Sequence, residues 1–145
     1  MIVKCKLDGL TFDCLREANM ARLRHFKNSK GEPAHKKEDG SDWSPAQWLQ
    51  ALIGEIGEYA NVRKKYERGD IDKETFDRAA MEELADVQTY LDLLALQLGI
   101  DLGIATMTKW NMVSVRVKSP ICILGPDYAD GGYMAMHSPS RDDPP

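Results

Sequence analysis

Two neighbouring stretches decide the fold: residues 44–69 read SPAQWLQALIGEIGEYANVRKKYERG, and residues 72–99 read DKETFDRAAMEELADVQTYLDLLALQLG. In the first, Ser44 can cap a helix whose first position is proline, and Gln47 completes a capping box. In the second, Asp72 is a good helix cap, and Gly99 supplies the left-handed residue that is favoured after a helix end. We therefore expect two long helices, the first ending at Gly69.

Two further helices are expected, one on each side of this pair. The earlier one runs from a Thr11 cap to about Phe26, and the later one starts after an Asp101 cap. The later helix ends before Ser119, because a residue that precedes proline avoids the helical conformation. Residues 28–42 are polar, contain two glycines and one proline, and are predicted to form a surface loop.

These elements predict an all-α fold, an antiparallel helical bundle. The chain has 145 residues, which fits one domain. We expect this helical domain over residues 1–118, followed by a Pro/Gly-rich tail over residues 119–145 that is partly disordered.

Composition limits the partners and the compartment. The formal charge of −4 gives no electrostatic reason to bind nucleic acid. No apolar run approaches the length of a membrane span, and the N-terminus lacks the apolar run of a secretory signal. Cys5, Cys14 and Cys122 have no spacing typical of a disulfide framework or a zinc site. We expect a cytoplasmic protein, in the host cytoplasm if it is viral.

Each long helix carries a pair of acidic residues three positions apart, on one helix face. The pairs are Glu55 with Glu58 and Glu83 with Asp86. At about 100° per residue, the first pair shares its side of the helix with aromatic and apolar neighbours. The second pair lies beside a stripe that we expect to face the core, formed by Leu84, Val87, Leu91, Leu94 and Leu98.

Carboxylates beside a core are costly unless they are paired or bound to metal. Two packed helices would bring the four acids together, as hard oxygen ligands that suit Mg²⁺ or Mn²⁺. The alternative, for any single pair, is a set of surface acids on an amphipathic helix. A ferritin-like di-iron site is disfavoured, because neither Glu55 nor Glu83 has a histidine three residues later. Nor do His25 and His35 have the spacing of metal ligands.

The two acidic pairs occur in the order Glu55-Ile-Gly-Glu58 and then Glu83-Leu-Ala-Asp86. This ordered pair resembles the signature of the MazG-like all-α nucleoside triphosphate pyrophosphohydrolases, and the flanking sequences up to residues 109–116 (KWNMVSVR) are similar too. The similarity covers roughly residues 11–116. Within this family the chain looks most like the phage branch called MazZ, which acts on dGTP and dATP-related nucleotides. The C-terminal tail departs from the family pattern.

The resemblance implies hydrolysis of a (deoxy)nucleoside triphosphate, with dGTP or GTP as the expected substrate, to the monophosphate and pyrophosphate. It implies that Glu55, Glu58, Glu83 and Asp86 bind two or more Mg²⁺ (or Mn²⁺) ions, and that Glu55 also orients the attacking water. The other residues matched to substrate binding are Asn61, Lys65, Tyr90, Lys109, Asn111 and Arg116. Trp48, with Trp43, is a candidate to stack on the base.

Several alternatives remain open at this point. A pyrimidine substrate such as dCTP or dUTP fits the same acidic residues, and core packing is an equal alternative for Tyr90. A non-catalytic helical oligomerisation module would explain the apolar stripes without any metal. The resemblance also implies a homo-oligomer, a dimer or a dimer of dimers.

Overall fold

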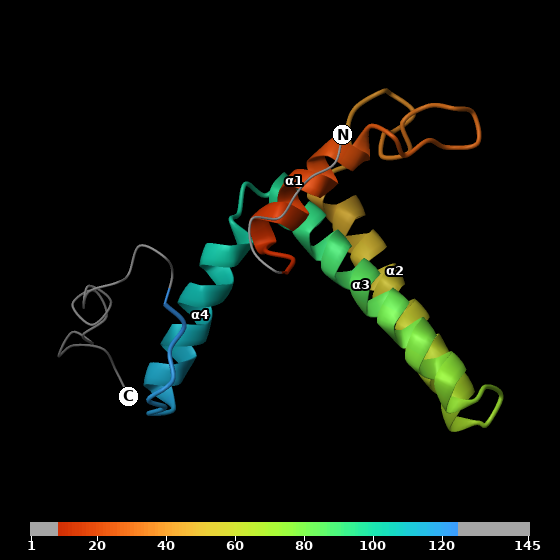
Figure 1. Cartoon of the computed structure of the whole chain (residues 1–145). Coiled ribbons are helices and arrows are strands. Elements are labelled where there is room, and N and C mark those ends of the chain that lie inside the picture. Colours follow the sequence, from red (N-terminus) through yellow and green to blue (C-terminus); the bar gives the residue numbers. More distant parts are fainter. Residues whose placement is uncertain (1–8, 125–145) are drawn as a thin grey trace. The chain divides into compact units, whose positions relative to one another are not determined.

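A computed structural model describes residues 9–124, and these form four helices: α1 (Phe12–Leu23), α2 (Pro45–Glu67), α3 (Lys73–Gln97) and α4 (Leu102–Arg116) (Figure 1). Within residues 9–124 there is no β-strand; the loop after α1 has two isolated bridges, Lys27 with Pro33 and Lys36 with Asp42. The predicted all-α class is confirmed for this part of the chain.

The chain divides into two compact units, Met1–Leu102 and Gly103–Pro145. The first unit contains α1, α2 and α3, and the second contains α4 after its first residue. This division falls earlier than the expected boundary between residues 118 and 119. The predicted tail lies mostly outside the described residues, so its character stays a prediction.

Local signals set the helix ends, as the sequence predicted. The capping bonds are Cys14 N–H to Thr11 Oγ1 (3.1 Å), Ser44 N–H to Gln47 Oε1 (3.0 Å) and Thr75 N–H to Asp72 Oδ1 (2.8 Å). Gly69 and Gly99 follow α2 and α3 with φ of 76° and 66°, a left-handed conformation that costs glycine little.

Helix α1 ends three residues before the predicted Phe26. The N–H groups of His25 and Phe26 donate to carbonyls three residues earlier, at 2.8 and 3.2 Å, instead of four residues earlier. This tighter turn leaves the α-helical path, as helix C-termini often do. It takes the chain into the loop of residues 28–42.

Helices α2 and α3 form a long antiparallel hairpin and lie side by side (Figure 1). Near the connecting turn, the rings of Tyr66 and Phe76 stack with centroids 4.6 Å apart. The predicted apolar stripes are only partly buried: Leu84 is 53% exposed, and on α2 Ile53 is 58% exposed. The expectation that the whole α3 stripe faces the core is therefore wrong for the single chain, because one partner helix can cover only part of it.

A buried polar network joins α1 to the C-terminal half of α3. Asp92, 1% exposed, accepts hydrogen bonds from Arg16 Nε (2.8 Å) and Asn19 Nδ2 (2.9 Å). A second Arg16 nitrogen donates to the carbonyl of Ile100 at 3.2 Å. Since a buried carboxylate must be paired, this network fixes which face of α1 packs on α3.

Within the second unit, the side chain of Asn111 holds the chain segment that follows α4. Its Nδ2 donates to the Ile123 carbonyl and its Oδ1 accepts from the Ile123 N–H, both at 2.8 Å. Asn111 is 1% exposed, so both halves of a buried amide are satisfied by one backbone unit.

Candidate functional site

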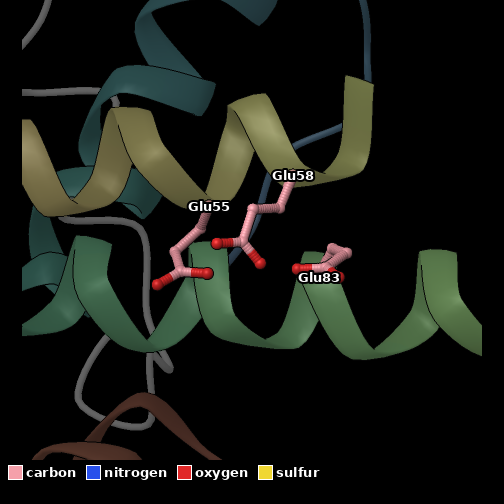
Figure 2. Close-up of side chains that lie close together, drawn as sticks. All are labelled: Glu55, Glu58 and Glu83. Carbon is pink, nitrogen blue, oxygen red and sulfur yellow. The ribbon is translucent and has the colours of Figure 1, made fainter. Parts of the chain in front are cut away.

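Three glutamates meet in the space between α2 and α3. Figure 2 shows Glu55 and Glu58 reaching from α2 toward α3, where the carboxylate of Glu83 faces them. One oxygen of each residue lies within 4.8 Å of the others, and we call Glu55, Glu58 and Glu83 the carboxylate cluster. The sequence prediction that the two helices bring their acids together is thus confirmed for these three residues.

The fourth predicted acid, Asp86, is not part of the carboxylate cluster, but its charge acts on it. The pKa of Glu55 is raised first by loss of solvation and then by the charges of Glu58, Asp86 and Glu83. The pKa of Glu83 is raised by loss of solvation, then by Glu58 and Asp86. Four negative charges held this close favour either protonation or a bound cation.

No basic side chain neutralises these acids within residues 9–124. The ion pairs in this range join other residues: Arg16–Asp92, Lys36–Asp42, Arg63–Glu67, Arg68–Asp70 and Lys73–Asp77. Carboxylate oxygens are hard ligands, and their number and spacing here fit Mg²⁺ or Mn²⁺. The donor set therefore fits the predicted divalent cation.

A cavity of about 310 Å³ lies beside the carboxylate cluster, within the first unit. Its volume is at the lower end of that of small-molecule sites. The lining residues come from α1, α2, α3 and the loop: Asn19, Arg22, Leu23, Phe26, His35, Glu55, Asp86, Thr89, Tyr90 and Leu93. Glu55 belongs both to this lining and to the carboxylate cluster, so the two features are continuous.

Aromatic rings form one side of the cavity. His35 stacks on Trp48 with centroids 4.7 Å apart and makes edge contacts with Phe26 at 5.5 Å and Trp43 at 4.9 Å. Burial lowers the pKa of His35, which keeps its ring neutral near pH 7. The polar loop thus has an inward-facing ring, although most of its side chains are exposed.

Of Tyr90 and Trp48, both predicted to contact the nucleotide, only Tyr90 lines the cavity. Tyr90 lines the cavity, and its pKa is raised by loss of solvation and by the charge of Glu55. Trp48 is only 2% exposed and lies behind the lining, with its ring 6.2 Å from that of Tyr90. Its indole N–H has no hydrogen-bond partner among the described residues. Trp48 therefore supports the aromatic wall instead of forming its surface.

The remaining predicted substrate-binding residues do not line this cavity. On α2, Asn61 is exposed and accepts a hydrogen bond from Lys64 Nζ at 3.0 Å, and Lys65 is exposed. Lys109, Asn111 and Arg116 belong to the second unit. The hydrogen bonds of Asn111 to Ile123 give it a structural role there. Binding of substrate by these five residues stays a prediction.

Sequence reasoning missed the contribution of α1 and of the loop. Asn19, Arg22, Phe26 and His35 all line the cavity. In the helix that the sequence predicts up to about Phe26, intervals of three and four would place Asn19, Arg22 and Phe26 on one face, and this was the available signal. His35 carried no such signal, because its inward position depends on the path of an irregular loop.

No family model matches the sequence, and no curated protein matches it at a significant level. Among the described residues, no single helix is long and apolar enough to cross a membrane, although α3 and α4 taken together pass that test by length and composition.

Proposed function

We propose that the chain is a Mg²⁺-dependent nucleoside triphosphate pyrophosphohydrolase, which cleaves a (deoxy)nucleoside triphosphate to the monophosphate and pyrophosphate. The observation that carries this proposal is the position of Glu55, which joins a cation-binding set of carboxylates to a cavity of ligand size. A phosphate chain held at the carboxylate cluster would leave the attached nucleoside beside the aromatic wall. The resemblance to MazG-like enzymes supports the same reaction.

In this reaction a water oxygen attacks the α-phosphorus, the bond to the bridging oxygen breaks, and pyrophosphate leaves with the electron pair. When bound, Mg²⁺ would neutralise part of the negative charge of the phosphates. Glu55 would orient the water and accept its proton. The carboxylate cluster, Glu55, Glu58 and Glu83, would hold the cation together with Asp86.

The nucleoside is assigned to the cavity because of the character of its walls. Phe26, His35 and Tyr90 offer flat surfaces on which a base can stack. The family resemblance favours dGTP or GTP, and dCTP or dUTP is the alternative substrate class. Neither choice changes the role of the carboxylates.

The proposal includes a homo-oligomer, a dimer or a dimer of dimers. Support comes from the apolar side chains that a single chain leaves exposed on both long helices: Leu49 (46%), Ile53 (58%), Ile56 (49%), Met81 (67%) and Leu84 (53%). Uncovered apolar residues in such number on a helix pair are typical of an interface. Sedimentation velocity at micromolar concentration tests this, and a monomer alone would contradict it.

The test of the reaction is a product analysis. The purified chain is incubated with each canonical (d)NTP and Mg²⁺ or Mn²⁺ in isotopically labelled water, and the products are identified by phosphorus NMR and mass spectrometry. We expect monophosphate and pyrophosphate, with the label in the monophosphate. Orthophosphate as the first product would indicate attack at the γ-phosphorus and would refute the proposed cleavage.

Two variants separate this enzyme from a non-catalytic module. Glu58→Gln removes one carboxylate of the cluster and should abolish turnover. Glu74→Gln removes the same charge from an exposed position in the first turn of α3 and should retain turnover. If no nucleotide is turned over by the unaltered chain, the oligomerisation module becomes the better explanation.

A further inference from the structure

One lining residue of the cavity is a permanent cation, and no role has been assigned to it so far. Arg22 lies in the last turn of α1, and it is the only Lys or Arg among the described residues that line the cavity. It takes part in no ion pair within residues 9–124, although Glu55 and Asp86 line the same cavity. Its guanidinium is therefore available to a ligand.

The buried network of α1 and α3 holds Arg22 in place. Arg22 Nη2 donates to Asn19 Oδ1 at 3.3 Å, and Asn19 Nδ2 donates to Asp92 Oδ2 at 2.9 Å. Because the carboxylate of Asp92 can only accept, the amide of Asn19 must present its oxygen to Arg22. Asn19 is 2% exposed and Asp92 1%, so both anchors are rigid.

The ring of Phe26 supports the guanidinium from another side. The Arg22 Cζ atom lies 5.3 Å from the centre of that ring, which is within the range of a cation–π contact. An arginine held by a hydrogen bond and a ring loses little further freedom when it binds a ligand. Such a group suits recognition of a ligand better than a freely moving surface side chain.

We propose that Arg22 is a specificity-determining residue that reads the base of the nucleotide in the cavity, and this inference rests on the proposed function. The cavity lining also includes Leu23, Phe26 and Leu93, whose apolar side chains suit a ring better than a phosphate. A guanidinium offers only N–H donors, so it favours a base with two adjacent acceptors and opposes one with a donor in that place.

Two bases present such an edge. Guanine has N7 and O6, and cytosine has O2 and N3. Adenine places its amino group beside N1 and N7, and the thymine acceptors flank an N–H group. The inference therefore predicts preference for guanine or cytosine nucleotides over adenine and thymine nucleotides, with Arg22 as the cause.

The experiment compares kcat and KM for dGTP, dCTP, dATP and dTTP in the unaltered chain, Arg22→Lys, Arg22→Ala and the control Arg24→Ala. Arg24 is an exposed arginine just after α1 that does not line the cavity. Both Arg22 variants should lower kcat/KM for the preferred nucleotide about 5- to 150-fold, mostly through KM, and leave the poor substrates nearly unchanged. Arg24→Ala should keep the preference.

Two results would overturn the inference. If Arg22→Lys keeps the base preference, or if Arg22→Ala weakens all four nucleotides equally, then Arg22 acts as a general positive charge and does not read the base. The inference is also overturned if the unaltered chain shows no preference among the four bases.

A binding measurement separates this inference from the proposed function. Titration with dGMP, dCMP, dAMP and dTMP can be followed by tryptophan fluorescence, because Trp48 lies directly behind the cavity wall. If no nucleotide is hydrolysed but Arg22-dependent base preference is seen in binding, the inference holds and the proposed reaction fails. If there is no preference in binding either, both fail.

Discussion

Removal of the Asp92 carboxylate should strongly destabilise the first unit. Asp92→Ala leaves the donors Arg16 Nε and Asn19 Nδ2 without the acceptor that they share. Breaking a buried ion pair from one side costs about 3–5 kcal/mol. Arg16 is 22% exposed and can regain some water, so the lower end of that range applies, about 3 kcal/mol.

Two comparison variants make this prediction specific. Glu67→Ala breaks the ion pair with Arg63, in which the Arg63 side chain is 50% and the Glu67 side chain 59% exposed, and it should cost far less stability than Asp92→Ala. Asp92→Asn keeps the shape but turns one acceptor into a donor, so its cost should be intermediate, about 1–3 kcal/mol.

The assay is urea unfolding followed by circular dichroism, together with thermal melting. For a unit of this size, about 3 kcal/mol corresponds to a fall in Tm of roughly 12–24 °C. If Asp92→Ala costs no more than Glu67→Ala, the network does not hold α1 on α3, and the argument that it fixes Arg22 fails with it.

Three further predictions concern glycine positions, charge repulsion and the cation. Gly69→Ala should destabilise the fold by about 1 kcal/mol, because Gly69 has a φ of 76°. Gly57→Ala, in α2 with nothing within 4 Å of the added carbon, should stabilise the fold by about 0.5–1 kcal/mol. Urea unfolding measures both changes, and a change in stability of the same sign for both variants would contradict the conformational argument. Without metal at pH 7, Glu83→Gln should raise Tm, because the pKa of Glu83 in the folded protein lies above its ordinary value of 4.5. The folded state binds the proton of Glu83 more tightly than the unfolded state, so this gain in Tm should shrink as the pH falls through the folded-state pKa toward 4.5. A gain in Tm that does not depend on pH would contradict the charge repulsion at Glu83. Mg²⁺ or Mn²⁺ should raise the Tm of the unaltered chain more than the Tm of Glu58→Gln. Differential scanning fluorimetry of chelator-treated protein measures both values, and an equal rise in Tm would argue against the carboxylate cluster as the cation site.

The caps and helix ends were predictable because their signals are local. Ser44, Gln47 and Asp72 act on backbone groups within three residues, and Gly69 and Gly99 need only their own φ. The end of α1 was missed, because the competing turn at Phe26 belongs to the path of the following loop.

The site was predictable to a smaller degree. The spacing within the pairs Glu55/Glu58 and Glu83/Asp86 predicted that each helix presents acids on one face, and the sequence order of the helices made the pairing of the two helices a reasonable expectation. The spacing did not predict that Asp86 would line the cavity while the other three converge, since this depends on the rotation and register of α3 against α2.

The four helices, their approximate bounds and the two acidic pairs can be predicted from the sequence, because periodicity and capping groups act within one or two turns of a helix. Three contacts follow from packing alone: α1 docks through Asp92, His35 faces inward from a polar loop, and Asn111 binds the backbone of Ile123. These contacts join residues far apart in the chain or depend on irregular backbone, so they arise from packing and from the need to pair buried polar groups. The cavity beside Glu55 depends both on the local signals that form the helices and on the tertiary packing that brings α1, α2, α3 and the loop together.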